Sequence, residues 1–124
     1  MKNNLSNLPG IALGFMMIVF GMNKFLGFIP VEPPEGDTAQ KFLGTMFSSY
    51  LFVVVALAEI IGGVLIAVPK TRTLGWLILL PVIFNIVAFH FAHDFIGNGI
   101  WILPVALFLI DGFVVRNQLK TIIN

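Results

Sequence analysis

Lys24 and Glu59 are ionisable residues that lie inside long apolar stretches of this 124-residue chain. A charged side chain at the centre of a membrane costs roughly 2.5–3.5 kcal/mol on insertion scales, so it normally has a charged partner, a water-filled pocket or a ligand. An ammonium group donates hydrogen bonds and a carboxylate accepts them, so this pair can bind a polar ligand and exchange protons with it. Each residue also has a structural explanation. Lys24 can extend to the membrane boundary, and Glu59 can serve helix packing alone.

Further polar side chains accompany the pair in the same apolar stretches or at their ends: Asn23, Asn85, His90 and His93. A helix rises 1.5 Å per residue, which places Lys24 about 22 Å and His90 about 24 Å from the inner ends of their helices. The same count places Glu59 roughly 13–14 Å and Asn85 about 16 Å from those ends. The sequence therefore predicts two polar layers. The stem of Lys24 is long enough to bend towards Glu59, so direct contact is possible but not required.

The third apolar stretch carries His90, His93 and Asp94, which share one helical face because they are spaced i, i+3 and i+4. Three such ligands can hold a metal ion. No other carboxylate clearly completes the set and the chain has no cysteine, so we expect no metal site and favour helix capping or a proton path. Asn85 and His90 lie about 140° apart around the helix, so both cannot point at its inner side. His93 lies between them.

The composition indicates a membrane protein. The chain is 58% hydrophobic and 10% charged, whereas soluble domains are about half apolar and about a quarter charged. A chain of 124 residues accommodates about four spans of ~20 residues in one domain covering residues 1–124. The net charge of +1 is uninformative, but the lack of a basic cluster argues against a nucleic-acid partner.

The hydropathy pattern predicts an all-α integral membrane four-helix bundle with spans at residues 8–29, 47–68, 74–93 and 99–115. Between the first two spans, residues 30–46 form a polar, proline-rich loop in which 38–46 can be a short interfacial helix. One side of the membrane receives most basic residues: Lys2, Lys70, Arg72, Arg116 and Lys120. The positive-inside rule then places both termini in the cytoplasm, with a short extracytoplasmic loop after the first span.

Small residues mark the faces by which two of these helices are expected to pack. On the first span the spacing is 4, 3, 4, 3 through Gly10, Gly14, Met17, Gly21 and Lys24. On the second span one face holds Ala56, Glu59, Gly62 and Gly63. Small residues let membrane helices approach closely, so both charges are expected at helix contacts rather than in lipid. In the fourth span, Asp111 is expected to be a structural anchor within reach of Arg116.

These residues together resemble the DoxX/DoxD family of small four-span membrane proteins. The resemblance covers most of the chain. It rests on the glycine-rich first span ending in Lys24-Phe25, the EIIGGVL run of Glu59–Leu65, Thr71-Arg72 before the third span, and His90 near its end. It implies a four-helix bundle in a bacterial cytoplasmic (inner) membrane. Family members are associated with quinone-linked oxidation of sulfur compounds, as in thiosulfate:quinone oxidoreductase, and with redox-stress complexes.

Two functional hypotheses follow. In the first, the protein is a quinone-binding or redox-associated membrane subunit, and if an enzyme, part of a quinone-linked oxidoreductase. Lys24 or His90 would bind a quinone carbonyl and Glu59 would exchange protons, with Asn23, Asn85 and His93 lining the site. In the second, it is a non-catalytic accessory or assembly subunit of a larger membrane complex, with Lys24–Glu59 as an internal ion pair. The expected partners are the lipid bilayer and other membrane subunits or further copies of the chain. A transporter, the third alternative, would need oligomerisation to build two gates.

Overall fold

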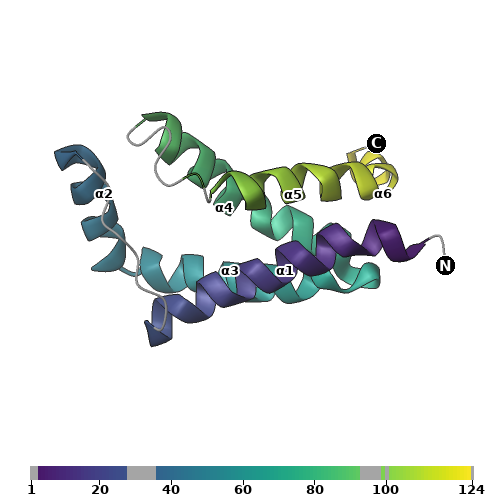
Figure 1. The fold of residues 1–124 in the computed structure, drawn as a ribbon, viewed down its shortest axis with the longest axis horizontal. Coiled ribbons are helices and arrows are strands. Elements are labelled where there is room, and N and C mark those ends of the chain that lie inside the picture. The colour runs from purple at the N-terminus through teal and green to yellow at the C-terminus, as the bar shows by residue number, and fades with distance from the viewer. Residues whose placement is uncertain (1–2, 28–35, 93–98, 100, 124) are drawn as a thin grey trace.

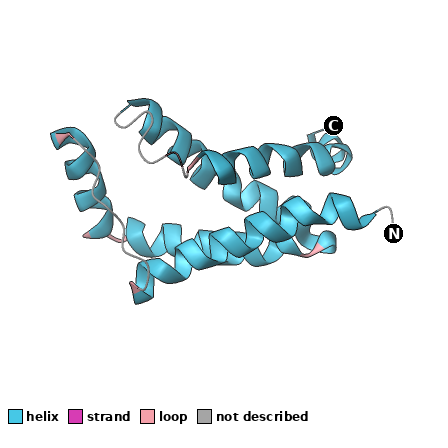
Figure 2. Cartoon of the chain, viewed as in Figure 1, coloured by secondary structure: helices cyan, strands magenta, loops and turns pink. Residues whose placement is uncertain are grey.

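A computed structural model describes residues 3–27, 36–92, 99 and 101–123, and all regular structure in these ranges is helical (Figures 1 and 2). The elements are α1 (Asn3–Leu26), α2 (Asp37–Phe47), α3 (Leu51–Ala67), the 3-10 turn η1 (Pro69–Thr71), α4 (Arg72–Ala92), α5 (Ile102–Val114) and α6 (Arg116–Ile123). The all-α prediction is confirmed, and so is the short helix before the second predicted span.

Two helical segments are each long and apolar enough to cross a membrane, namely Ser6–Leu26 and Pro69–Phe91. The count rises to four if bent helix pairs act as single spans: α2 with α3, at an angle of 80°, and α5 with α6, at 69°. The bend between α2 and α3 replaces a continuous span from residue 47. The hydroxyls of Ser48 and Ser49 donate to the carbonyls of Gly44 and Met46, which gives the end of α2 local partners.

Glycine determines how closely α1 and α3 pack, as the predicted stripes required. A Cβ atom added to Gly63 would lie 2.7 Å from the carbonyl oxygen of Gly14, and one added to Gly14 would lie 2.5 Å from that of Gly63. Gly75 of α4 likewise faces the backbone of Ile66 on α3, whose Cα would lie 2.8 Å from an added Cβ. Any larger side chain at these positions would push the helices apart. The antiparallel pair α1–α3 is thus the centre of the fold, with α4 packed on α3 and α5 on α1 and α4.

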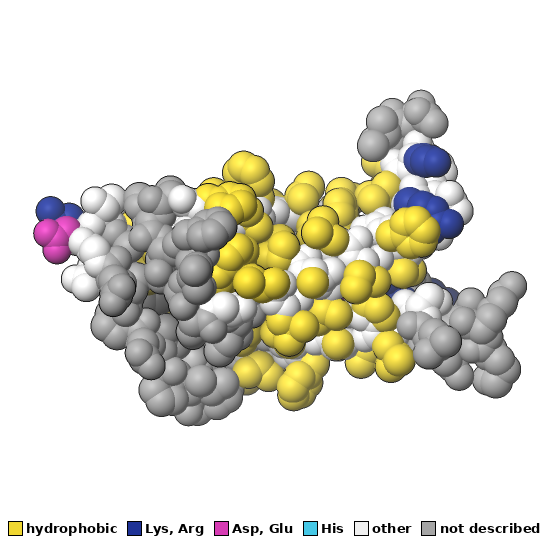
Figure 3. Space-filling view, turned by 45° about the horizontal axis from the view of Figure 1, so that its top comes forward, with side chains coloured by type: hydrophobic (Ala, Val, Ile, Leu, Met, Phe, Trp, Pro, Cys, Tyr) yellow, Lys and Arg dark blue, Asp and Glu magenta, His cyan; other side chains and the backbone are white. Residues whose placement is uncertain are grey.

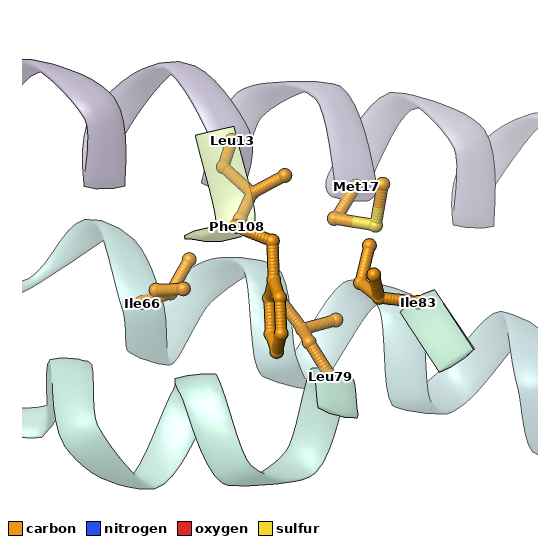
Figure 4. Close-up of a cluster of buried hydrophobic side chains, with 6 residues drawn as sticks. All are labelled: Leu13, Met17, Ile66, Leu79, Ile83 and Phe108. Carbon is orange, nitrogen blue, oxygen red and sulfur yellow. The ribbon is translucent and has the colours of Figure 1, made fainter. Parts of the chain in front are cut away.

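The buried hydrophobic cluster draws on all four of these helices: Leu13, Met17, Ile66, Leu79, Ile83 and Phe108 (Figure 4). Trp76 of α4 supports it by stacking on Phe108, with ring centroids 4.5 Å apart, while its indole N–H donates to the Phe108 carbonyl at 2.9 Å. On the face drawn in Figure 3, apolar side chains cover the middle of the molecule and charged side chains lie at its two ends. We call the end that holds α2 and the last turn of α1 the Lys24 end, and the end that holds the start of α4 and α6 the Arg72 end.

Candidate functional site

Lys24 and Glu59 form a direct ion pair between α1 and α3. The Lys24 Nζ atom donates to Glu59 Oε1 at 2.7 Å. The Glu59 side chain is only 4% exposed, whereas that of Lys24 is 19% exposed. The carboxylate is therefore enclosed by the protein, and the ammonium group is its link to the surface of the fold.

The register of the antiparallel helices brings the two charges together. Gly14 lies against Gly63. About two turns further along α1, a Cβ atom added to Gly21 would lie 2.7 Å from the Ala56 carbonyl oxygen and 3.3 Å from the Glu59 Cβ atom. Lys24 follows Gly21 by three residues, so it lies one turn beyond this contact and its stem reaches back to the carboxylate. The contact that the sequence left open is therefore made, and the long lysine stem spans the difference in depth between the two residues.

Within the described residues, the structure does not bring the other predicted site residues, Asn23 and Asn85, together with the ion pair in one pocket. Asn23 is half-buried beside Lys24 in the last turn of α1, where its carbonyl accepts a hydrogen bond from the Gly27 N–H at 2.7 Å. Asn85 is exposed on α4, because the buried face of that helix runs through Leu79 and Ile83 instead. His93, like Asp94, lies outside the described residues.

His90 belongs to an aromatic cluster made by α2, α4 and the residue before α5: Phe42, Phe89, His90 and Trp101. The His90 ring stacks on Trp101, with centroids 4.5 Å apart, and meets the edge of Phe89 at 5.3 Å. Phe89 in turn contacts Phe42 of α2 at 5.5 Å. His90 Nδ1 lies 2.8 Å from the Ile86 carbonyl oxygen. A carbonyl only accepts, so Nδ1 carries a hydrogen and Nε2 is the atom that can accept a hydrogen bond from a ligand.

The ion pair and the aromatic cluster share one end of the molecule. α1 and α3 run antiparallel and α4 returns along α3, so the end of α1, the start of α3 and the end of α4 all lie towards α2 (Figure 1). Among the described residues, however, no hydrogen bond or ion pair joins His90 to Lys24 or Glu59, and Figure 1 shows the end of α4 diverging from the end of α1. The structure therefore offers two neighbouring polar groups at the Lys24 end.

The opposite end is organised by Arg72, which is buried at the start of α4. Its Nε donates to the Ile66 carbonyl at 2.7 Å, Nη2 to the Ala67 carbonyl at 3.0 Å and Nη1 to Asn7 Oδ1 at 2.8 Å. The last carbonyls of a helix have no intrahelical N–H partner, so the guanidinium caps α3 and ties it to α1. Gly10 leaves the space that the guanidinium occupies. The sequence identified Arg72 as a cytoplasmic charge and as part of the Thr71-Arg72 motif, but it did not predict this capping role. The sequence pattern that could have predicted this cap is an arginine that follows shortly after the proline at the end of an apolar helix.

Asp111 of α5 is fully buried near Arg72 and is attracted to its charge. Neither carboxylate oxygen accepts a hydrogen bond from any described residue. The prediction that Arg116 pairs with Asp111 is wrong. The Nη1 atom of Arg116 donates to the Phe113 carbonyl at 2.7 Å, and its guanidinium lies over the Phe113 ring, 3.9 Å from the centroid. The cause is the bend after Val115, which carries Arg116 to the outside of the fold.

The chain was compared with protein-family models, with curated protein sequences and with solved structures, and none of the three comparisons found a match.

Proposed function

We propose that this protein is a quinone-binding or redox-associated membrane subunit, with Lys24 as the residue that binds the quinone head group. The carrying observation is the asymmetry of the ion pair: Glu59 is enclosed, whereas the Lys24 ammonium keeps partial exposure. An ammonium group has three N–H donors, and Glu59 Oε1 takes one. The others can donate to a quinone carbonyl. Phe25 and Phe52, which meet edge to face at 6.2 Å, offer apolar contact at the same end.

Proton exchange is the role proposed for Glu59. Reduction of a quinone to a quinol takes up two electrons and two protons. A carboxylate bonded to the ligand-binding ammonium is one group through which such protons can pass, and His90 Nε2 in the aromatic cluster is a second. Under this proposal the chain binds the quinone and handles protons, while a partner subunit supplies the electrons.

The proposal also assigns a membrane topology. α1, α3, α4 and α5 would form a four-helix bundle across a bacterial inner membrane, with both termini on the cytoplasmic side. The motif resemblance to the DoxX/DoxD family supports this assignment. The distribution of exposed charge agrees with it, because Lys70, Arg116 and Lys120 all lie at the Arg72 end.

The two tryptophans of the chain allow a direct test, because Trp101 lies in the aromatic cluster and Trp76 lies at the Arg72 end. A short-chain ubiquinone analogue is added to the protein in nanodiscs, and quenching of tryptophan fluorescence is followed. We expect strong quenching in Trp76→Phe, which retains Trp101, and weak quenching in Trp101→Phe.

The same assay tests the binding residues. Loss of a hydrogen bond from a charged group costs about 1.5–3 kcal/mol, so Lys24→Met should weaken quinone binding about 10–100-fold. Lys41→Met, an exposed change on α2, serves as the matched control. Unchanged affinity in Lys24→Met, Glu59→Gln and His90→Ala would reject the site.

A non-catalytic accessory or assembly subunit is the second candidate, favoured by the fact that the ion pair is satisfied within the chain. In that case Lys24 and Glu59 only specify packing, and an apolar pair can replace them. The double variant Lys24→Met/Glu59→Leu would then still co-purify with its membrane partners. The first candidate predicts instead that this variant folds but no longer binds the quinone analogue.

A further inference from the structure

The Arg72 end carries a short amphipathic helix that leaves the axis of the fold. α6 is bent by 69° from α5, and Val115, which is buried, forms the corner between them. Leu119 and Ile122 follow Val115 at helical spacing and make an apolar stripe, half-buried at Leu119 and exposed at Ile122. Arg116 and Lys120 lie one turn apart beside this stripe and are both exposed. The helix thus presents an apolar row flanked by a basic row.

The exposed charge at this end has a single sign. Within the described ranges, the exposed charged residues there are Lys70, Arg116 and Lys120, and the acidic residue of this end, Asp111, is buried. Figure 3 shows Lys and Arg side chains gathered at one end, whereas at the other end Lys and Arg lie together with Asp or Glu. The opposite short helix, α2, carries Asp37 beside Lys41 and is therefore mixed in charge.

The guanidinium of Arg116 is also held at a fixed position against Phe113, at the end of α5. Its guanidinium lies 3.9 Å above the ring of Phe113, and its Nη1 is bonded to the Phe113 carbonyl at 2.7 Å. Phe113 is itself exposed in the last turn of a strongly apolar helix. The charge is thereby fixed where apolar surface gives way to polar surface, which is the position of a phospholipid head group.

We propose that α6 lies along the membrane surface and that Arg116, Lys120 and Lys70 bind the phosphates of anionic phospholipids. The apolar stripe would face the acyl chains, as in interfacial amphipathic helices. The single sign of the exposed charge selects anionic over zwitterionic lipid. This inference rests on a membrane location but not on quinone binding.

The test uses the full chain in nanodiscs of phosphatidylcholine with or without phosphatidylglycerol, and measures by native mass spectrometry which lipid is retained. Arg116 and Lys120 together should contribute a factor on the order of 30 to the preference for phosphatidylglycerol, and the double variant Arg116→Gln/Lys120→Gln, which keeps Lys70, should lose that factor. Lys41→Gln, at the other end, should keep it. Equal preference in the double variant and in Lys41→Gln would overturn the proposal, as would equally effective competition by inorganic phosphate.

Helix orientation gives a second readout, because the chain has no cysteine and accepts single-site labelling. An environment-sensitive fluorophore on Ile122→Cys should report an apolar surrounding in phosphatidylglycerol nanodiscs, and one on Asn117→Cys, which is exposed on the opposite face of α6, an aqueous one. Equally aqueous signals at both positions would refute a helix lying on the membrane.

Discussion

Removing one member of the Lys24–Glu59 pair should destabilise the protein far more than removing both. At a separation of 2.7 Å and an effective dielectric constant of about 20, the attraction between the charges is about 6 kcal/mol, most of which is offset by their desolvation. A single substitution leaves an unpaired buried charge, at a cost of about 3–5 kcal/mol. Lys24→Met should approach the upper value, because it strands the enclosed Glu59 carboxylate. Glu59→Leu should cost less, because the partly exposed lysine can turn outwards.

The double variant Lys24→Met/Glu59→Leu should lie within about 1 kcal/mol of the unmodified protein, since no charge is left unpaired. The free energy of unfolding is measured by titration with sodium dodecyl sulfate in mixed micelles, followed by far-UV circular dichroism. Lys41→Met should change it by less than about 0.5 kcal/mol. The coupling free energy of the pair should exceed about 2 kcal/mol. A double variant whose cost equals the sum of the single costs would refute the reasoning.

Two further substitution pairs test the rest of the fold with the same unfolding measurement. Gly63→Ala should cost about 1–3 kcal/mol, because its Cβ would lie 2.7 Å from the Gly14 carbonyl oxygen. Gly44→Ala, whose Cβ meets nothing within 4 Å, should be neutral or stabilising; equal effects at both sites would contradict the close-packing argument. Arg72→Leu removes three hydrogen bonds and should be costlier than Asp111→Leu, which removes two carboxylate oxygens that accept no hydrogen bond from any described residue. The reverse order would show that Asp111 has a donor of its own.

Local sequence patterns predicted the helical elements well. The apolar stretches correspond to α1, α3, α4 and α5, although α3 begins at Leu51 rather than at residue 47 and α4 begins at Arg72 rather than at residue 74. Hydropathy is calculated from neighbouring residues, so it can predict helices without knowledge of the fold. The ends were less accurate because serine hydroxyls and the proline turn determine them through individual hydrogen bonds.

Side-chain partners were predicted less well, because they depend on register and rotation between helices. The sequence left contact between Lys24 and Glu59 open, placed Asn85 near Glu59 and offered Arg116 as the partner of Asp111. The structure joins the first two, exposes Asn85 and turns Arg116 away.

What the sequence alone determined is a helical, strongly apolar chain with charges at costly positions and glycine on the faces that must pack. Only the tertiary structure decided what those charges do. Contact between Gly14 and Gly63 sets the α1–α3 register that closes the Lys24–Glu59 pair, and the turn at Pro69–Thr71 folds Arg72 back onto the end of α3. A charge in an apolar environment must find a partner, but which partner it finds depends on helix register, which neighbouring residues in the sequence do not encode.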